Sequence, residues 1–179
     1  PQYAFAEISW WSEQDLKDDK KRQGYIEVLK KWIAQDAQSY TAISARNDWA
    51  DQYEDKALPE DLKKELKKNL EILKPLSTDP TAAKELFKAW GVYGIAPYEQ
   101  EEVYAQWLAS AKALKDPKSE EIKAQLQALL KSRAYDLHKP GEILEGLAYF
   151  RKAELVQEEG EWLRKLAEAN PQTYVYHMK

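Results

Sequence analysis

The 179-residue sequence contains no cysteine and only two histidines, His138 and His177. Without cysteine the chain has no disulfide, no thiolate nucleophile and no cysteine ligand for zinc. Two histidines are too few for a conventional histidine-rich metal site. The sequence therefore predicts neither a metal site nor a bound cofactor.

Long apolar runs and an excess of one charge are also missing. No segment approaches the roughly 20 apolar residues of a membrane-spanning helix, so we expect no membrane insertion. The N-terminal stretch PQYAFAEISWW lacks the basic residues and the apolar core of a signal peptide. The net charge is −4 with both signs mixed along the chain, whereas nucleic-acid-binding proteins usually carry a basic patch. We expect a soluble protein, cytoplasmic or recombinant, that does not bind nucleic acid.

Strong helix formers dominate the sequence, while glycine and methionine are scarce. Segments such as LPEDLKKELKKNLEILK and DPKSEEIKAQLQALLKS place leucine or isoleucine at helical spacing and fill the other positions with lysine, glutamate and alanine. Helix surfaces of this idealised kind are typical of engineered proteins. A natural helical protein from a thermophile is the alternative interpretation.

Apolar spacing and helix-breaking residues predict an all-α, mainly helical fold, a compact array of about six or seven helices. Gly24 is expected to end a first helix that begins near Glu13, and Pro75 is expected to end a later helix. Helices are expected at about 13–24, 25–46, 59–75, 80–90, 98–114, 117–137 and 141–168.

Two Asp-Pro pairs, Asp79-Pro80 and Asp116-Pro117, have the pattern of a helix N-cap followed by proline at the first helical position. Aspartate at the cap accepts an otherwise unpaired backbone N–H, and proline has no N–H to leave unpaired. Both pairs are therefore expected to start helices.

The chain is expected to form a single helical domain, 1–179, with sub-units 1–90 and 98–179 around the joint GVYGIAP as the alternative. The terminal segments QYAFAEISW and QTYVYHMK are aromatic and rich in β-formers. They are expected to pair as a small two-stranded sheet or to pack on the helices as an aromatic coil. If the first segment is a strand, Trp10 and Trp11 point to opposite faces.

Small and aromatic residues recur in HKPGEILEGLAYFRKAEL at the spacing of Gly141, Gly146, Phe150 and Ala153. The residues before it that fit a preceding helix are Leu130, Ala134 and Leu137. This segment, about residues 127–160, resembles a helical hairpin of the tetratricopeptide repeat family. Residues 60–90 also overlay 120–150 at several helical and proline positions, as in an internal repeat or a shared helix period.

The resemblance implies a peptide-binding solenoid in which the small residue lets two helices approach closely. It also implies an interaction groove near Tyr149 and Phe150. The opening signature of the family is matched only by Trp90, Tyr93 and Gly94. The sequence departs from the family where Pro97 interrupts the helix and where Gly146 replaces the usual alanine, and an ordinary helical hairpin is the alternative.

Polar residues lie at helical spacing in IAQDAQSYTAISARNDWADQYED, where a buried face is expected. Burying a carboxylate without a partner is costly, and the neighbouring alanines leave room for a pocket. We therefore interpret this face as a candidate ligand site, flanked by two tryptophans. Its residues are Asp36, Tyr40, Ser44, Asn47, Trp32 and Trp49. The alternative is a polar shoulder on which Asp36 pairs with a lysine or arginine.

The sequence gives no positive indication of catalysis, because it contains no nucleophile or phosphate-binding motif. His138 is expected at a helix C-terminus, where a cation is favoured by the helix dipole. The alternative, functional interpretation is that His138 acts as a general base beside Asp136 or Tyr135. An acidic run is interpreted as a solvated helix end rather than a metal site; it comprises Asp48, Asp51, Glu54 and Asp55.

Three functions remain open from the sequence. The first is a non-enzymatic helical scaffold or protein-interaction module, whose partner is a protein or a peptide. The second is a helical bundle that binds a small apolar or aromatic ligand between tryptophan and tyrosine side chains. The third is an enzyme whose site includes His138.

Overall fold

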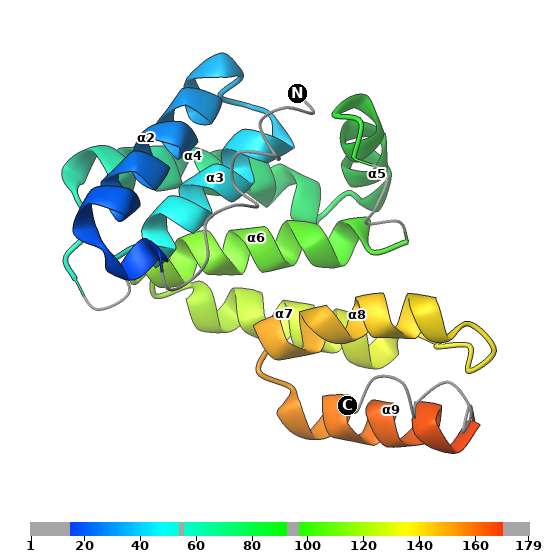
Figure 1. Cartoon of the computed structure of the whole chain (residues 1–179). Helices are drawn as coiled ribbons and strands as arrows, with labels where there is room; N and C mark the ends of the chain where they lie inside the picture. The colour runs from blue at the N-terminus through cyan, green and yellow to red at the C-terminus, as the bar shows by residue number, and fades with distance from the viewer. Residues whose placement is uncertain (1–14, 54–55, 93–96, 170–179) are drawn as a thin grey trace.

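The computed structural model describes residues 15–53, 56–92 and 97–169, and all regular structure within them is helical. The predicted all-α class is confirmed for this part of the chain (Figure 1). The elements are the 3₁₀ helix η1 (Asp15–Lys17) and the eight α-helices α2 (Asp19–Gln35), α3 (Tyr40–Asp51), α4 (Glu60–Ser77), α5 (Pro80–Ala89), α6 (Glu99–Ala113), α7 (Ser119–Ser132), α8 (Pro140–Lys152) and α9 (Val156–Ala169). The terminal segments expected to form strands, with Trp10, Trp11 and His177, lie outside the described residues.

Eight α-helices in the described residues correct the expected six or seven, because the segment 141–168 forms two helices. α8 ends at Lys152, and Glu154 then adopts a left-handed conformation with φ 61°. The Leu155 N–H donates to the Phe150 carbonyl at 2.8 Å. Such a bond over five residues closes the end of a helix and turns the chain. The sequence has no glycine at this position, so no local signal predicts the turn.

Neither Gly24 nor Pro75 ends a helix, contrary to expectation. Gly24 lies inside α2, whose first turn is capped by Asp18 and whose buried face begins at the next residue, Tyr25. A single glycine costs about 1 kcal/mol in a helix, which tertiary burial outweighs. Pro75 lies inside the last turn of α4, which ends two residues later at Ser77.

The first predicted proline start is confirmed and the second is wrong. Asp79 caps α5 through a backbone N–H of its first turn at 2.9 Å, and Pro80 is the first helical residue. Asp116 instead accepts the N–H of Lys118 at 2.9 Å in a turn, and α7 begins at Ser119. Aspartate side chains favour such turns as readily as helix caps.

α6 is the central helix of the fold and packs against α3, α4, α5, α7 and α8. Figure 1 shows it crossing the middle of the molecule, with α2 and α3 on one side and α7 to α9 on the other. Because it has neighbours on several sides, α6 buries polar as well as apolar residues, among them Glu101, Glu102 and Ser110. Three negative residues in its first turn also complement the helix dipole.

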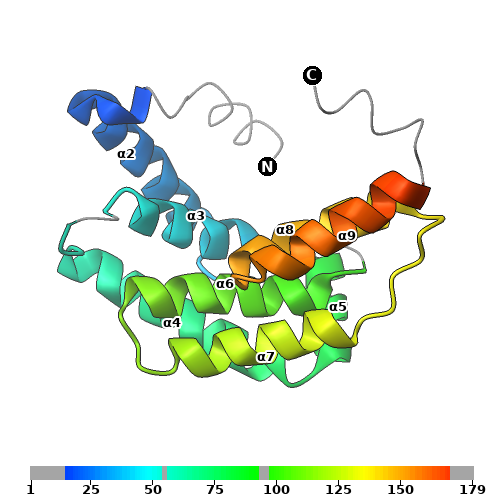
Figure 2. The ribbon, with the colours of Figure 1, turned by 90° about the horizontal axis from the view of Figure 1, so that it is seen from below.

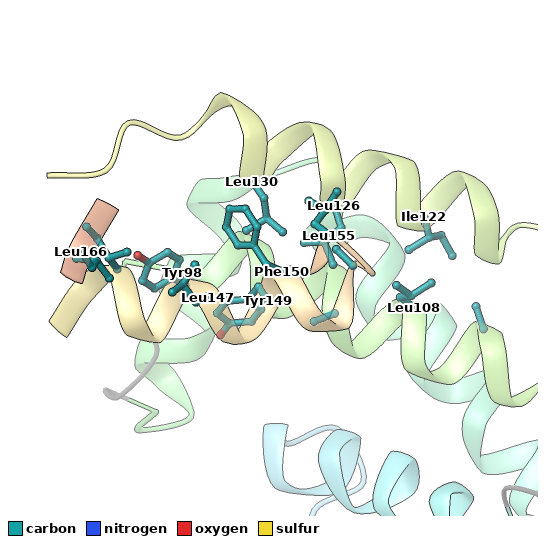
Figure 3. Packing of buried hydrophobic residues seen from close by; sticks show 14 residues of the cluster. Tyr98, Leu108, Ile122, Leu126, Leu130, Leu147, Tyr149, Phe150, Leu155 and Leu166 are labelled. Atoms are coloured by element: carbon teal, nitrogen blue, oxygen red, sulfur yellow. The ribbon is translucent and has the colours of Figure 1, made fainter. Parts of the chain in front are cut away.

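The largest apolar cluster joins α6 to α7, α8 and α9 (Figure 3). Phe150 is 1% exposed and Tyr149 is buried beside it. The open groove expected near these two residues is therefore contradicted, since both side chains fill the core. Gly146 does permit a close approach, but its neighbour is Tyr98, at the start of α6, rather than the preceding helix.

Two further apolar clusters complete the core. One joins α2, α3 and the first half of α4, and the other joins the end of α4 to α5 and α6. Among the described residues, none of the helices is both long enough and apolar enough to cross a membrane.

Candidate functional site

A polar stripe on α6 lies against α3 and forms the centre of the candidate site. Its members are Glu102, Gln106 and Ser110, spaced four residues apart so that they share one helix face. Glu102 and Ser110 are buried, and Gln106 is half-buried. Buried polar groups require hydrogen-bond partners, and these come from helices far away in the sequence.

The partners of this stripe on α3 are Tyr40 and Asn47. The Tyr40 hydroxyl donates to Glu102 Oε1 at 2.8 Å, and Gln106 Nε2 donates to the same oxygen at 2.6 Å. Asn47 Nδ2 donates to Gln106 Oε1 at 2.6 Å, and Ser110 Oγ donates to Asn47 Oδ1 at 2.7 Å. The side chains thus form a continuous hydrogen-bonded row between the two helices.

The row continues to Arg46, a fully buried cation. Asn69 of α4 donates from Nδ2 to Ser110 Oγ at 3.0 Å and accepts at Oδ1 from Arg46 Nη1 at 3.0 Å. The guanidinium also donates to Glu65 Oε2 at 2.9 Å and to the Ala37 carbonyl at 2.7 Å. We call the set from Tyr40 to Glu65 the polar network. Because its buried members are paired, it fixes α3, α4 and α6 in one register.

The opposite end of the network, at Glu102, reaches α8. Burial alone would raise the pKa of Glu102. Lys152, whose Nζ lies 3.5 Å from Glu102 Oε2, and hydrogen bonds from Gln106, Tyr40 and Tyr149 hold that pKa below its usual range. Burial, and then the Glu102 carboxylate, raise the pKa of both tyrosines. Glu102 is therefore ionised and both hydroxyls are protonated at neutral pH.

Two adjoining hollows open along α6 beside this network. The smaller, of about 330 Å³, lies between α3, α6 and the end of α8, and Figure 2 shows α8 ending near α3 above α6. The larger, of about 1160 Å³, continues past the ends of α3 and α6. The two share Asp51, Ala109 and Lys112. We call them together the groove.

Alanines form much of the groove. Ala105, Ala109 and Ala113 are spaced four residues apart on α6, so they lie in a second stripe beside the polar one. Ala50 of α3 lines the larger hollow from the opposite side. Alanine has a single methyl group, so this pairing of helices leaves space that larger side chains would fill.

Asp48 lines the smaller hollow and has a perturbed carboxyl group. Burial, and then the Asp51 carboxylate one turn away, raise its pKa to about 6 against the opposing effect of Lys152. Tyr25 of α2, Tyr40 of α3 and Lys112 of α6 are further titratable groups near these carboxylates. A carboxyl group that is perturbed by burial and by a like charge, and that lines a hollow, is a typical mark of a functional site.

Replacing Asp48 by asparagine is expected to stabilise the protein at about pH 8 and to have no effect near pH 3.5. In the folded state Asp48 keeps its proton up to about pH 6, whereas the unfolded chain releases it near pH 4. The folded state thus binds more protons between these values, so stability falls as the pH rises through them. The expected gain for Asp48→Asn above pH 6 is about 1–2 kcal/mol.

Urea denaturation at about pH 3.5, 6 and 8 measures this gain. Glu145→Gln is the matched control, because Glu145 is exposed on α8 and lines neither hollow; we expect it to change stability by under about 0.5 kcal/mol. An Asp48→Asn variant that is equally stabilised at all three pH values would contradict the assigned titration.

The structure brings together only part of the predicted ligand face. Tyr40 and Asn47 lie in the polar network, and Ser44 is half-buried between them on α3. Asp36 is exposed, contrary to its expected place on the buried face, because α2 ends at Gln35. Its carboxylate accepts the Gln38 N–H at 3.2 Å within the turn before α3.

Trp32 and Trp49 belong to the apolar cluster of α2, α3 and α4 and line neither hollow. Trp49 is 3% exposed, with Lys30 over its ring at 4.9 Å. Their role among the described residues is packing, so the expected tryptophan-lined pocket does not coincide with either hollow.

His138 is exposed in the loop between α7 and α8, and not at a helix C-terminus, because α7 ends at Ser132. Its backbone N–H donates to Asp136 Oδ1 at 2.9 Å, and Tyr135 packs against Trp162 instead. No group of three or more metal-binding side chains is found in the described residues. Of the acidic run, Asp51 is exposed while Asp48 is partly buried, and the other two residues lie outside the described part.

Sequence reasoning missed the α6 half of the site and the buried Arg46. One signal was available, because Glu102, Gln106 and Ser110 repeat every four residues beside an equally regular alanine stripe. Such a polar row inside a helix with apolar flanks indicates a buried network. Its partners Tyr40 and Asn47 lie about 60 residues away, so no local pattern could pair them.

Comparison of the chain with protein-family models, with curated proteins and with solved structures finds no match in any of the three. The likeness of residues 127–160 to a tetratricopeptide repeat therefore stays a prediction. The residues and their geometry are thus the only basis on which a function can be proposed.

Proposed function

We propose that the protein is a non-enzymatic interaction module that binds an extended peptide segment of another protein in the groove along α6. The observation that carries this proposal is the pair of adjoining hollows over the alanine stripe. They share Asp51, Ala109 and Lys112 and are both open to solvent, so they form one continuous depression rather than an enclosed cavity.

The dimensions and chemistry of the groove suit an extended chain. The α6 axis from Ala105 to Ala113 is about 12 Å long at 1.5 Å per residue. An extended peptide covers that length with about four residues. The groove combines an apolar floor with a charged rim, the usual anatomy of a protein-binding surface.

The polar network supports this role by holding the walls of the groove in place. Asn47 and Gln106 line the smaller hollow and are hydrogen-bonded to each other across α3 and α6. A rigid, preformed groove loses little conformational entropy when it binds, which favours affinity. The two other functions have less support, because His138 lies outside both hollows and none of the tryptophans in the described part of the chain lines them.

Filling the groove is expected to abolish peptide binding without unfolding the protein. Ala109 is exposed on α6 and lines both hollows, so Ala109→Trp places a large ring where the peptide would lie. We expect dodecapeptides selected on the immobilised chain from a random displayed library to bind this variant at least about tenfold more weakly, a loss of about 1.4 kcal/mol. Fluorescence anisotropy with the synthesised peptides measures the change.

Ala128→Trp is the matched control, since Ala128 is exposed on α7 and lines neither hollow. It should bind the same peptides within about twofold of the original chain. Failure of the library to yield a binding peptide would contradict the proposal. So would peptides that bind both tryptophan variants equally well.

A further inference from the structure

We propose that the groove selects its occupant by charge, taking a lysine or arginine side chain at the Asp48–Asp51 end and an acidic side chain at the opposite, lysine-lined end. This inference rests on the proposed peptide-binding function and specifies its ligand. The occupant is thus an extended segment with opposite charges about four residues apart.

The acidic end is formed by two carboxylates on one face of α3. Asp48 and Asp51 are one helical turn apart, and both line the smaller hollow. Burial, and then the Asp51 carboxylate, oppose ionisation of Asp48. A cationic side chain placed between them would relieve both effects and would form charge-assisted hydrogen bonds.

The two lysines of the smaller hollow are already engaged elsewhere. Lys152 lies 3.5 Å from Glu102 and over the ring of Tyr149 at 5.1 Å. Lys112 donates to Glu154 Oε1 at 2.5 Å. Lys152 still lowers the pKa of Asp48, but burial and Asp51 outweigh it. The local cations therefore leave Asp48 incompletely compensated.

The larger hollow has the opposite balance of charge. Its lining includes four lysines, Lys56, Lys63, Lys112 and Lys115, against one carboxylate, Asp51. Lys63 pairs with Glu60 at 2.6 Å in an exposed contact, which contributes little. Lys115 has no ion pair with any residue in the described part of the chain. An acidic side chain entering here would meet Lys56 and Lys115, and would compete with the exposed Glu60 for Lys63.

The spacing between the two ends follows from α6. Asp48 lines the smaller hollow with Ala105, and Asp51 lies where the two hollows join. Lysines line the larger hollow with Ala113, about 12 Å from Ala105 along the axis. At about 3.3 Å per residue an extended chain spans this distance in about four residues.

The test uses synthetic octapeptides with blocked termini, carrying one lysine and one glutamate on a neutral background of alanine, leucine and threonine. The separation of the two charges varies from one to six residues. Companion peptides replace lysine by norleucine or glutamate by glutamine. Calorimetry at low salt measures binding to the full chain and to its variants Asp48→Asn, Lys115→Gln and Ala109→Trp. The controls are Glu145→Gln and Lys64→Gln, since Lys64 is exposed on α4 and lines neither hollow.

We expect the tightest binding at a separation of about four. Replacing the peptide lysine by norleucine should weaken binding roughly fivefold or more on the original chain and on Glu145→Gln, and under about twofold on Asp48→Asn. Replacing the peptide glutamate by glutamine should likewise weaken binding roughly fivefold or more on the original chain and on Lys64→Gln, and under about twofold on Lys115→Gln. Such pairwise dependence assigns each charge to its end of the groove.

Neutral peptides that bind as tightly as charged ones, yet are lost on Ala109→Trp, would overturn the charge selection while leaving the peptide groove intact. Equal binding at all separations would do the same. If all of the peptides bind the Ala109→Trp variant as tightly as they bind the original chain, the proposed peptide groove is contradicted. The inference about charge selection is then contradicted too.

Discussion

Replacing Arg46 with methionine is expected to lower the free energy of unfolding by about 3–5 kcal/mol. Its guanidinium is fully buried and donates to Glu65, to Asn69 and to the Ala37 carbonyl. Methionine fills part of the space but donates no hydrogen bond. The Asn69 acceptor then loses its partner in a buried setting, while the Ala37 carbonyl loses its donor at an exposed position. Glu65 keeps its exposed contact with Lys68.

Urea denaturation of the full chain at neutral pH measures this loss. Arg22→Met is the control. Like Arg46, Arg22 lies on a helix and pairs with a carboxylate, but its partner Asp19 is exposed. An exposed pair contributes at most about 1 kcal/mol. The double variant Arg46→Met with Glu65→Leu should recover part of the stability, since the half-buried carboxylate is removed as well. Equal effects of Arg46→Met and Arg22→Met would mean that the network does not hold the helices together.

Replacing Gly146 with alanine is expected to destabilise the protein by about 1–3 kcal/mol, although alanine favours helix formation. A Cβ at this position would lie 2.7 Å from the Tyr98 hydroxyl and 2.9 Å from Cζ of the same ring. Tyr98 has little freedom to move away. Its hydroxyl donates to the Glu142 carbonyl at 2.5 Å, and its ring contacts both Arg133 and Tyr149.

Gly160→Ala provides a control with the opposite expected sign. Gly160 lies in α9, and no heavy atom lies within 4 Å of the position that a Cβ would take there, so alanine should stabilise by about 0.5–1 kcal/mol. In a Tyr98→Phe background, which removes the nearest clashing atom, Gly146→Ala should cost less than in the original chain. Thermal denaturation of the four variants tests both points, and a stabilising Gly146→Ala would contradict the packing described.

The helices were predictable where a local signal marks their ends. The Asp79 cap and Pro80 start α5, and the expected 98–114 matches α6 within one residue. The prediction failed where the chain turns without such a signal. Glu154 takes a left-handed conformation that glycine adopts more easily, so the end of α8 carries no local mark in the sequence.

Only the part of the candidate site that lies on α3 was predictable from the sequence. Tyr40 and Asn47 share a face of α3, and both proved to be in the polar network. Asp36 was assigned to that face by extending the spacing through a position where no helix exists. Helical spacing relates residues only within one helix, and the pairing of Asn47 with Gln106 depends on how α3 crosses α6, which no local pattern encodes.

The most direct test of the peptide groove is a ¹H–¹⁵N NMR titration of the labelled full chain with a peptide recovered from the library selection. Binding in the groove predicts the largest amide shift changes at Ala105, Ala109 and Ala113 and at the end of α3. The largest changes around the exposed Leu144 and Val156 of α8 and α9, with the α6 amides unmoved, would contradict it.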